Sequence, residues 1–210
     1  IGSLAGGGTT GGNIDLGANA LLSAGGNNTS TSYAGIISGT GTSGLAKAGT
    51  GTLTLTGAST YTGATTISGA GTLNLGGGTS GGSLASSGLN LGGGTLNYTR
   101  TGSTTQTFAT TTLTAGVNAV SAVSGDILNL GTITRTAGTI DFSSVGAGTV
   151  AALAGSNVNG IIPGATFGST WAVANGAGTA ITGLANGSYT LTSVAGTTAA
   201  KYTNANIDVD

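Results

Sequence analysis

The 210-residue chain contains no cysteine, histidine, methionine or glutamate, and it has one proline and one tryptophan. The absence of cysteine and histidine excludes a disulfide framework, a structural zinc site, haem or iron–sulfur ligation and any Cys- or His-based nucleophile. Charge is also scarce, because four Lys or Arg and five Asp leave a formal net charge of −1. The chain therefore offers no basic surface for nucleic acid. No apolar run of about 18 residues predicts a transmembrane helix.

Glycine and threonine dominate what is present, with 44 Gly and 40 Thr. The mean hydropathy is +0.31 and the hydrophobic fraction is 38%. Disordered chains combine low hydrophobicity with high net charge, so this composition predicts a folded protein. Helix is disfavoured because glycine interrupts nearly every ten-residue window, and each interior glycine costs about 1 kcal/mol relative to alanine. The chain begins Ile1-Gly2-Ser3 without a visible signal peptide, which indicates a mature product or a piece of a longer protein.

Short strands with one buried face recur along the chain, each alternating polar and apolar residues and stopping at glycine. The first two clear copies begin at Gly51 and Gly71, with two further short strands between them. Three short strands in about 20 residues describe one coil of a β-solenoid. We therefore predict an all-β fold, a parallel β-helix of about nine coils with glycine-rich corners. The clear copies are GTLTL at 51–55, GTLNL at 71–75, GTLNY at 94–98, GTITR at 131–135 and GTIDF at 138–142.

This pattern predicts three consecutive regions. Residues 1–156 form the solenoid. Residues 157–187, which hold Pro163, Phe167 and Trp171, form an irregular excursion or a cap over the open end, or else a wider coil with a bulky residue outside. Residues 188–210 form terminal strands of the same solenoid.

The amino-acid sequence of residues 33–76 is distinctive enough to compare with a known repeat. It runs from Tyr33-Ala34-Gly35-Ile36-Ile37-Ser38-Gly39 through Leu45-Ala46-Lys47-Ala48-Gly49 to the strands at 51–55 and 71–75. This segment strongly resembles the autotransporter-associated β-strand repeat, also called the passenger-associated transport repeat. The resemblance implies a right-handed parallel β-helix, displayed extracellularly on the surface of a bacterium with an outer membrane. The repeat of that family carries no catalytic residues, so none are transferred to this chain.

Chemistry on a β-helix needs paired carboxylates or an acidic calcium cluster beside Arg or Lys. The only carboxylates close in sequence are Asp208 and Asp210. Arg135 could meet Asp141, and Arg100 could meet Asp126, across adjacent coils, although such pairs are more often surface salt bridges. We predict no catalytic, cofactor-binding or metal-binding residue. The remaining ionisable side chains are Asp15, Lys47 and Lys201.

Three weaker patterns are also present. Gly11-Gly12-Asn13-Ile14-Asp15 approaches the calcium-binding nonapeptide of β-rolls, but it does not repeat. Asn-x-Ser/Thr patterns are expected by chance in a chain so rich in Asn and Thr. The tyrosines either align as an aromatic sugar-binding strip or lie at strand edges and corners. The Asn-x-Ser/Thr patterns begin at Asn27, Asn28, Asn97 and Asn186, and the tyrosines are Tyr33, Tyr61, Tyr98, Tyr189 and Tyr202.

The leading functional hypothesis is a non-catalytic structural or adhesive surface rod, either a segment of a large passenger-like protein or a fibre subunit. A fibre would assemble as a homo-oligomer or polymer through the solenoid ends, where strand edges are open to another copy. A cell-surface or polysaccharide ligand is a further candidate partner. The alternatives are a carbohydrate-active enzyme or sugar-binding module, and an ice-binding protein using Thr52, Thr54 and Thr56. In the last case asparagine replaces threonine at 74, 97 and 129.

Overall fold

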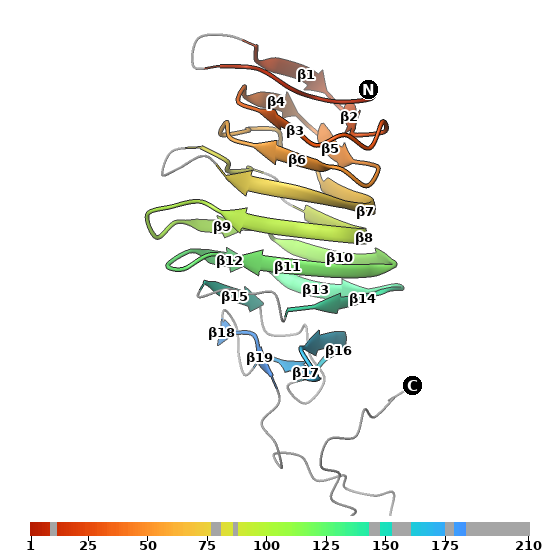
Figure 1. The fold of residues 1–210 in the computed structure, drawn as a ribbon, viewed down its shortest axis with the longest axis vertical. Helices are drawn as coiled ribbons and strands as arrows, with labels where there is room; N and C mark the ends of the chain where they lie inside the picture. The colour runs from red at the N-terminus through yellow and green to blue at the C-terminus, as the bar shows by residue number, and fades with distance from the viewer. Residues whose placement is uncertain are drawn as a thin grey trace, which may run out of the picture.

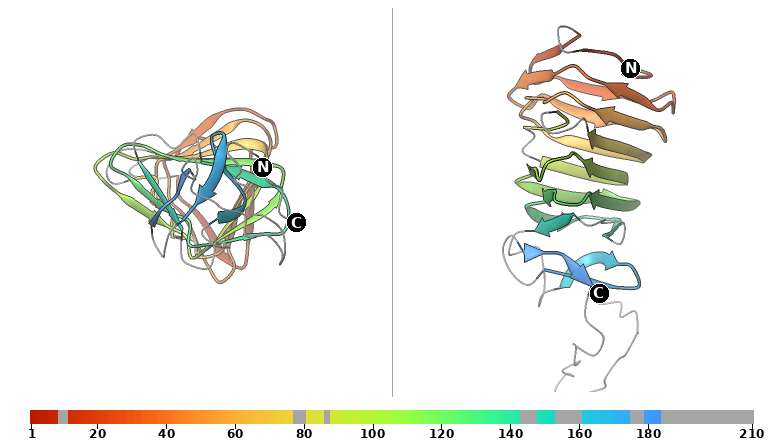
Figure 2. Two further views of the ribbon diagram at one scale, coloured as in Figure 1. Left: turned by 90° about the horizontal axis from the view of Figure 1, so that it is seen from below. Right: turned by 60° about the vertical axis from the view of Figure 1, so that its left-hand side comes forward.

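The computed structural model describes residues 1–8, 12–76, 81–85, 88–142, 148–152, 161–174 and 179–183. These residues form 19 β-strands and no helix, stacked along one long axis (Figure 1). Viewed along that axis, the coils superpose with a roughly three-sided outline (Figure 2). The fold is a parallel β-solenoid, which confirms the predicted class. Within the described residues, no helix is long and apolar enough to cross a membrane.

The strands line three faces. The first and second faces meet at a corner that lies within β7 and β8, because each of these long strands contributes its first half to one face and its second half to the next. The first face contains β2(Leu21–Ala24), β5(Gly44–Lys47), β7(Thr65–Gly76), β8(Gly88–Thr99), β10(Thr110–Ala115) and β13(Thr132–Arg135). The second contains β3(Thr31–Tyr33), β6(Thr52–Leu55), β7, β8, β11(Val117–Ala122), β14(Thr139–Asp141) and β16(Ile161–Phe167). The third contains β1(Ile14–Ala18), β4(Ile37–Thr40), β9(Thr105–Thr107), β12(Ile127–Asn129), β15(Thr149–Ala152) and β18(Thr179–Ala180).

The register gives the length of each coil. Partners in parallel strand pairs lie 20 residues apart at Leu45 and Thr65, and 25 apart at Ile140 and Ala165. The third face passes from Ile14 to Val150 in six steps, giving a solenoid of about six turns. The predicted nine coils were wrong, because within the described residues the strands after residue 167 pair antiparallel instead of adding parallel coils. At about 4.8 Å per coil, six steps span about 29 Å.

The C-terminal end of the stack changes strand direction. β16 pairs in parallel with β14, but β17(Thr170–Val173) folds back on β16 as an antiparallel hairpin. β19(Thr182–Gly183) pairs antiparallel with β17, and β18 pairs antiparallel with β15. These strands fall inside the predicted excursion or cap at 157–187, which stays a prediction. The predicted terminal strands at 188–210 lie outside the described residues.

The core consists of apolar columns that run along the axis. Leu53, Leu73 and Leu96 stack in register on the second face, with exposed fractions of 2%, 0% and 0%. Their polar neighbours on the same strands are half-buried and face outward. The alternation seen in the sequence therefore places one residue of each pair in the interior.

Glycines stack at the corner between the first and second faces. Each adopts a positive φ, which residues with a Cβ rarely tolerate. A Cβ at Gly138 would lie 2.6 Å from the backbone of Ala115 in the preceding coil, so this corner needs both the conformation and the small size. The members with φ values are Gly49 (69°), Gly69 (72°), Gly93 (90°), Gly116 (62°) and Gly138 (79°).

Candidate functional site

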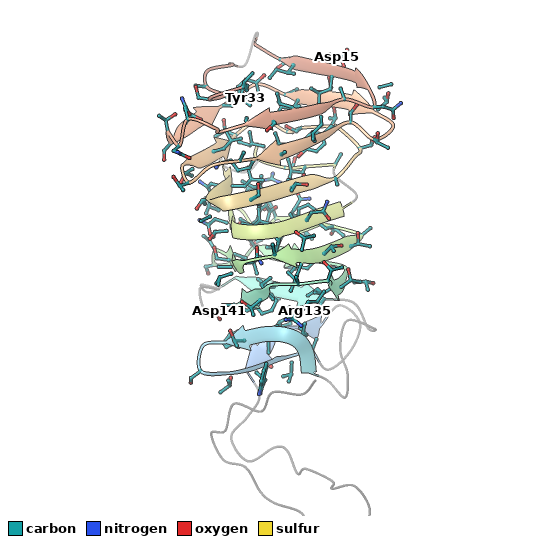
Figure 3. The ribbon with its side chains drawn as sticks, turned by 90° about the vertical axis from the view of Figure 1, so that its right-hand side faces the viewer. Asp15, Tyr33, Arg135 and Asp141 are labelled. Carbon is teal, nitrogen blue, oxygen red and sulfur yellow. The ribbon has the colours of Figure 1, made fainter. Side chains whose placement is uncertain are left out.

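The charged side chains that the structure describes do not gather into one cluster. Asp15 lies near the N-terminal end of the stack, whereas Arg135 and Asp141 lie toward the other end (Figure 3). Lys201, Asp208 and Asp210 lie outside the described residues. The remaining three, Lys47, Arg100 and Asp126, are buried.

Lys47 is an interior residue. It aligns with Ala24 and Ile67 in the neighbouring coils, at a position that alternation assigns to the core. Its side chain is 0% exposed, and its Nζ donates hydrogen bonds to the carbonyl oxygens of Ala48 (2.7 Å) and Gly49 (3.0 Å). Burial lowers the pKa of the Lys47 ammonium below its ordinary value of 10.5. The Lys47 side chain thus stabilises a corner from the interior of the solenoid, where a substrate cannot reach it.

Arg100 and Asp126 belong to one buried polar network, linked through Tyr98 and Thr104. Arg100 Nη1 donates to the Tyr98 hydroxyl (3.4 Å), which lies 2.8 Å from Thr104 Oγ1. Thr104 donates both its backbone N–H and its hydroxyl to Asp126 Oδ1, each at 2.9 Å. Arg100 is 8% exposed and Asp126 is 1% exposed. The network therefore ties adjacent coils together and presents no accessible acid or base to a polymeric substrate.

Arg135 and Asp141 bond to different parts of the chain. Arg135 Nε donates to the carbonyl oxygen of Gly138 (2.6 Å), closing the same corner that Lys47 closes in an earlier coil. Asp141 Oδ1 accepts hydrogen bonds from Thr166 Oγ1 (3.2 Å) and from the backbone N–H of Gly168 (3.3 Å). Arg135 thus stabilises its own corner, whereas Asp141 bonds to the following coil and to the turn after β16.

Asp15, at the end of the calcium-like pattern, bonds within β1 and to the neighbouring strand β4. Its Oδ1 accepts from the backbone N–H of Gly17 (2.9 Å) and from Ser38 Oγ (3.4 Å). Among the residues that the structure describes, no group of three or more His, Cys, Asp or Glu side chains could hold a metal ion.

Three tyrosines are core residues rather than surface aromatics. Tyr33, Tyr61 and Tyr98 are 2%, 0% and 0% exposed. The Tyr33 hydroxyl donates to the carbonyl of Gly12, and the Tyr61 hydroxyl lies 2.7 Å from Thr65 Oγ1. These three tyrosines form neither an aromatic sugar-binding strip nor a set of solvent-exposed edge or corner residues. Tyr189 and Tyr202 lie outside the described residues.

The outer surface carries ladders of small polar side chains. On the second face, Ser121 Oγ donates to Asn97 Oδ1 (2.8 Å), and Thr99 Oγ1 donates to Asn74 Oδ1 (2.7 Å). Each of these bonds joins one coil to the next. On the first face, β10 and β13 place two threonine pairs in register, Thr110 with Thr132 and Thr112 with Thr134.

Residues 45–75 cover β6 completely and all but one residue each of β5 and β7. Thr52 lies opposite Thr72, and Leu55 lies opposite Leu75, so this segment is one complete 20-residue coil together with the strands that begin the next. Residues 45–75 match the family model of the passenger-associated-transport-repeat. The match confirms the resemblance carried by residues 33–76. No curated protein and no solved structure matches the chain.

The passenger-associated transport repeat thus corresponds to a physical unit of the solenoid. Its two Gly-Thr-Leu strands stack on each other in register. It also contains Lys47 and Tyr61, both fully buried. Its buried polar side chains bond within the stack, since Lys47 Nζ donates to carbonyls of its own corner and Ser59 Oγ accepts from the Ile37 N–H of the preceding coil.

Sequence reasoning missed the interior polar residues. The strand pattern carried a signal for Lys47, because Leu45-Ala46-Lys47 alternates and places the lysine on the buried side. No such signal marks Gln106, whose amide accepts from the Leu84 N–H (3.0 Å) and donates to the Leu84 carbonyl (2.9 Å). The Gln106 amide thus takes the place of a backbone hydrogen-bonded pair between two coils, which only the stacked structure reveals.

Proposed function

We propose that this chain is a non-catalytic structural module of a bacterial surface or secreted protein of the passenger type, acting as a rigid extracellular spacer. The observation that carries the proposal is the passenger-associated transport repeat itself, present as one coil of a continuous in-register stack. A stack of backbone-paired coils resists bending because each coil is hydrogen-bonded to its neighbours.

The placement of the polar groups supports a structural role. Lys47, Arg135 and Asp141 each bond to corners or turns of the solenoid. Arg100 and Asp126 are buried. The outward side chains are mostly Thr, Asn and Ser, which stack without the repulsion that charged columns would suffer.

The surface location can be tested on cells that express the natural gene. Antibody raised against residues 1–183 should label intact cells or the culture medium. Labelling that appears only after lysis would refute the extracellular assignment. A cytoplasmic protein of known abundance serves as the control for leakage.

The spacer role is tested by removing one period. Deleting residues 89–110 joins Gly88 to Thr111, which lies in register with Leu89. The shortened chain should keep its far-ultraviolet circular dichroism, and small-angle scattering should show a rod shorter by about 4.8 Å. Deleting 89–99 instead, about half a period, should destroy the register and the cooperative unfolding transition. Equal tolerance of both deletions would contradict the proposal.

Self-assembly into a fibre is a sharper form of the same proposal, favoured by the N-terminal end. Within the described residues, β1 pairs only with β4 and β2 pairs only with β5, while residues 1–6 cover part of this end through bonds from Ile1 to Ser23 and between Gly6 and Tyr33. Leu16 and Leu22 are half-buried there, whereas the interior residues of later coils are covered on both sides. An open strand edge with an apolar rim is a natural docking site for a second copy.

Analytical ultracentrifugation and negative-stain microscopy across a concentration series test this form. We expect mass to increase with concentration for the wild type and for Thr134→Lys, which alters a lateral face. Leu22→Lys at the open end should stay monomeric. A wild-type chain that is monomeric at every concentration would remove the fibre role and leave the spacer role standing.

A further inference from the structure

Four Asn-x-Ser/Thr patterns occur in the sequence, and the structure separates them by accessibility. This pattern is the acceptor for N-linked sugar transfer, and the modified asparagine must lie on an accessible segment. Asn186 lies outside the described residues. The other three, Asn27, Asn28 and Asn97, have different surroundings.

Asn27 lies in the exposed turn that connects β2 to β3. Thr29, two residues later, donates its hydroxyl to Asn27 Oδ1 at 2.9 Å, and its backbone N–H approaches the same oxygen at 3.3 Å. The Asn27 Nδ2 donates no hydrogen bond among the residues that the structure describes. The Asn27 side chain is therefore exposed, with the threonine hydroxyl already in place beside its amide group.

Asn97 has the opposite environment. It lies within β8 and is paired in register with Asn74 on one side and Ser121 on the other. Its Oδ1 accepts from Ser121 Oγ, and the hydroxyl two residues later, that of Thr99, donates to Asn74 instead. A transferase would have to break these coil-to-coil hydrogen bonds to engage this half-buried asparagine and its threonine.

Asn28 is exposed but is engaged with the next coil. Its backbone has a φ of 63°, and its Oδ1 accepts from the Thr50 N–H at 2.9 Å. Ser30, two residues later, uses its hydroxyl oxygen to accept from the Thr52 N–H at 3.1 Å. The Asn28 and Ser30 side chains therefore each bond to the next coil and not to each other.

We propose that Asn27 is a site of N-linked glycosylation, with a nucleotide-activated hexose as the sugar donor. In the transfer, Asn27 Nδ2 forms a bond to C1 of the sugar while the bond from C1 to the diphosphate oxygen breaks. The nucleoside diphosphate leaves with that electron pair. One amide proton passes from Nδ2 to a base of the transferase, so the product is a neutral glycosyl amide.

The turn at Asn27 lies at a lateral corner of the solenoid. A sugar there projects away from the axis and leaves the coil-to-coil hydrogen bonds intact. It would add a strongly hydrated group to a surface whose nine charges in the whole chain provide little repulsion between molecules. The inference does not depend on the proposed spacer role, since it rests on the geometry of one turn.

The test is glycosylation of the folded chain by a soluble N-glycosyltransferase with UDP-glucose, followed by intact-mass and peptide mass spectrometry. We expect one hexose on the wild type, located at Asn27. Asn97→Gln should accept one hexose equally well. Asn27→Gln should accept none, and Thr29→Val should also accept none because it removes only the hydroxyl from the pattern.

A synthetic peptide spanning residues 22–34 is treated in parallel. Absence of hexose from the folded wild type overturns the proposal, and the peptide then shows whether the fold or the sequence prevents transfer. Attachment at Asn97 or Asn28 in place of Asn27 overturns it as well. Circular dichroism of each variant confirms that the compared chains are folded.

Discussion

The interior column of leucines allows a quantitative test of the solenoid, through Leu73→Ala. Leu73 is 0% exposed and lies between Leu53 and Leu96 of the adjacent coils. Truncating a buried leucine removes its transfer free energy and leaves a cavity, with a usual total of about 2–5 kcal/mol. The backbone of β7 is held by strands on both sides, so the cavity has little freedom to collapse. We therefore expect a loss of about 3–4 kcal/mol in the free energy of unfolding.

Urea unfolding followed by far-ultraviolet circular dichroism measures this loss. The midpoint should fall while the slope of the free energy against urea stays constant, because the same surface is exposed on unfolding. Thr72→Ala is the matched control, since Thr72 is the outward neighbour on the same strand and is half-buried. Its loss should stay below about 1 kcal/mol. Equal losses for the two variants, or a loss below about 1 kcal/mol for Leu73→Ala, would refute the assignment of the interior face.

The remaining predictions concern titration, corners and the interior amide. Burial raises the pKa of Tyr61 above its ordinary value of 10.0, so its neutral form stabilises the fold below that pH and this contribution is lost as the pH rises further. Burial also raises the pKa of Tyr33, so Tyr61→Phe should reduce the alkaline loss of stability in pH-dependent urea titrations without removing it. Burial lowers the pKa of Lys47, so stability should rise as the pH approaches 10.5, and Lys47→Met should remove that rise; a flat wild-type profile would contradict it. Gly17→Ala, with φ 62° and open space around the new methyl, should lower stability by about 1–2 kcal/mol. Gly138→Ala should cost clearly more because its Cβ meets backbone at 2.6 Å, and thermal melts of the two variants would show a wrong ranking directly. Gln106→Leu leaves a buried N–H and carbonyl without partners and should cost about 2 kcal/mol or more, whereas a stability equal to wild type would show that the amide pairing is dispensable.

The polar–apolar alternation and the glycines that bound each strand predicted the fold class, because both features act locally. The alternation in Thr52 to Leu55 and Thr72 to Leu75 places leucine inside and threonine outside, and the structure stacks these two strands in register. The number of coils was overestimated because the pattern gives no warning that β17 turns back on β16. That reversal depends on pairing between strands, which residue periodicity does not encode.

The ionisable residues show the same limit. Sequence spacing suggested contacts between Arg100 and Asp126, and the structure places Tyr98 and Thr104 between them in a buried network. Whether a charged side chain lies in the interior or outside is decided by which coil it enters. The alternation in Leu45-Ala46-Lys47 carried an unused signal for the burial of Lys47, but only the stacked corner supplies the carbonyls that make this burial tolerable.

The sequence by itself determined that the chain is all-β, that its repeating unit is a glycine-bounded coil, and that residues 33–76 carry a passenger-type repeat. These features are local, since they depend on side-chain alternation and on the conformational range of glycine. Tertiary structure alone decided the coil count, the burial of Tyr33, Tyr61 and Tyr98, and the difference between Asn27 and Asn97. Each of those outcomes depends on which residue of a neighbouring coil lies 4.8 Å away, at about the spacing of paired strands, and that neighbour is about 20–25 residues distant in the chain.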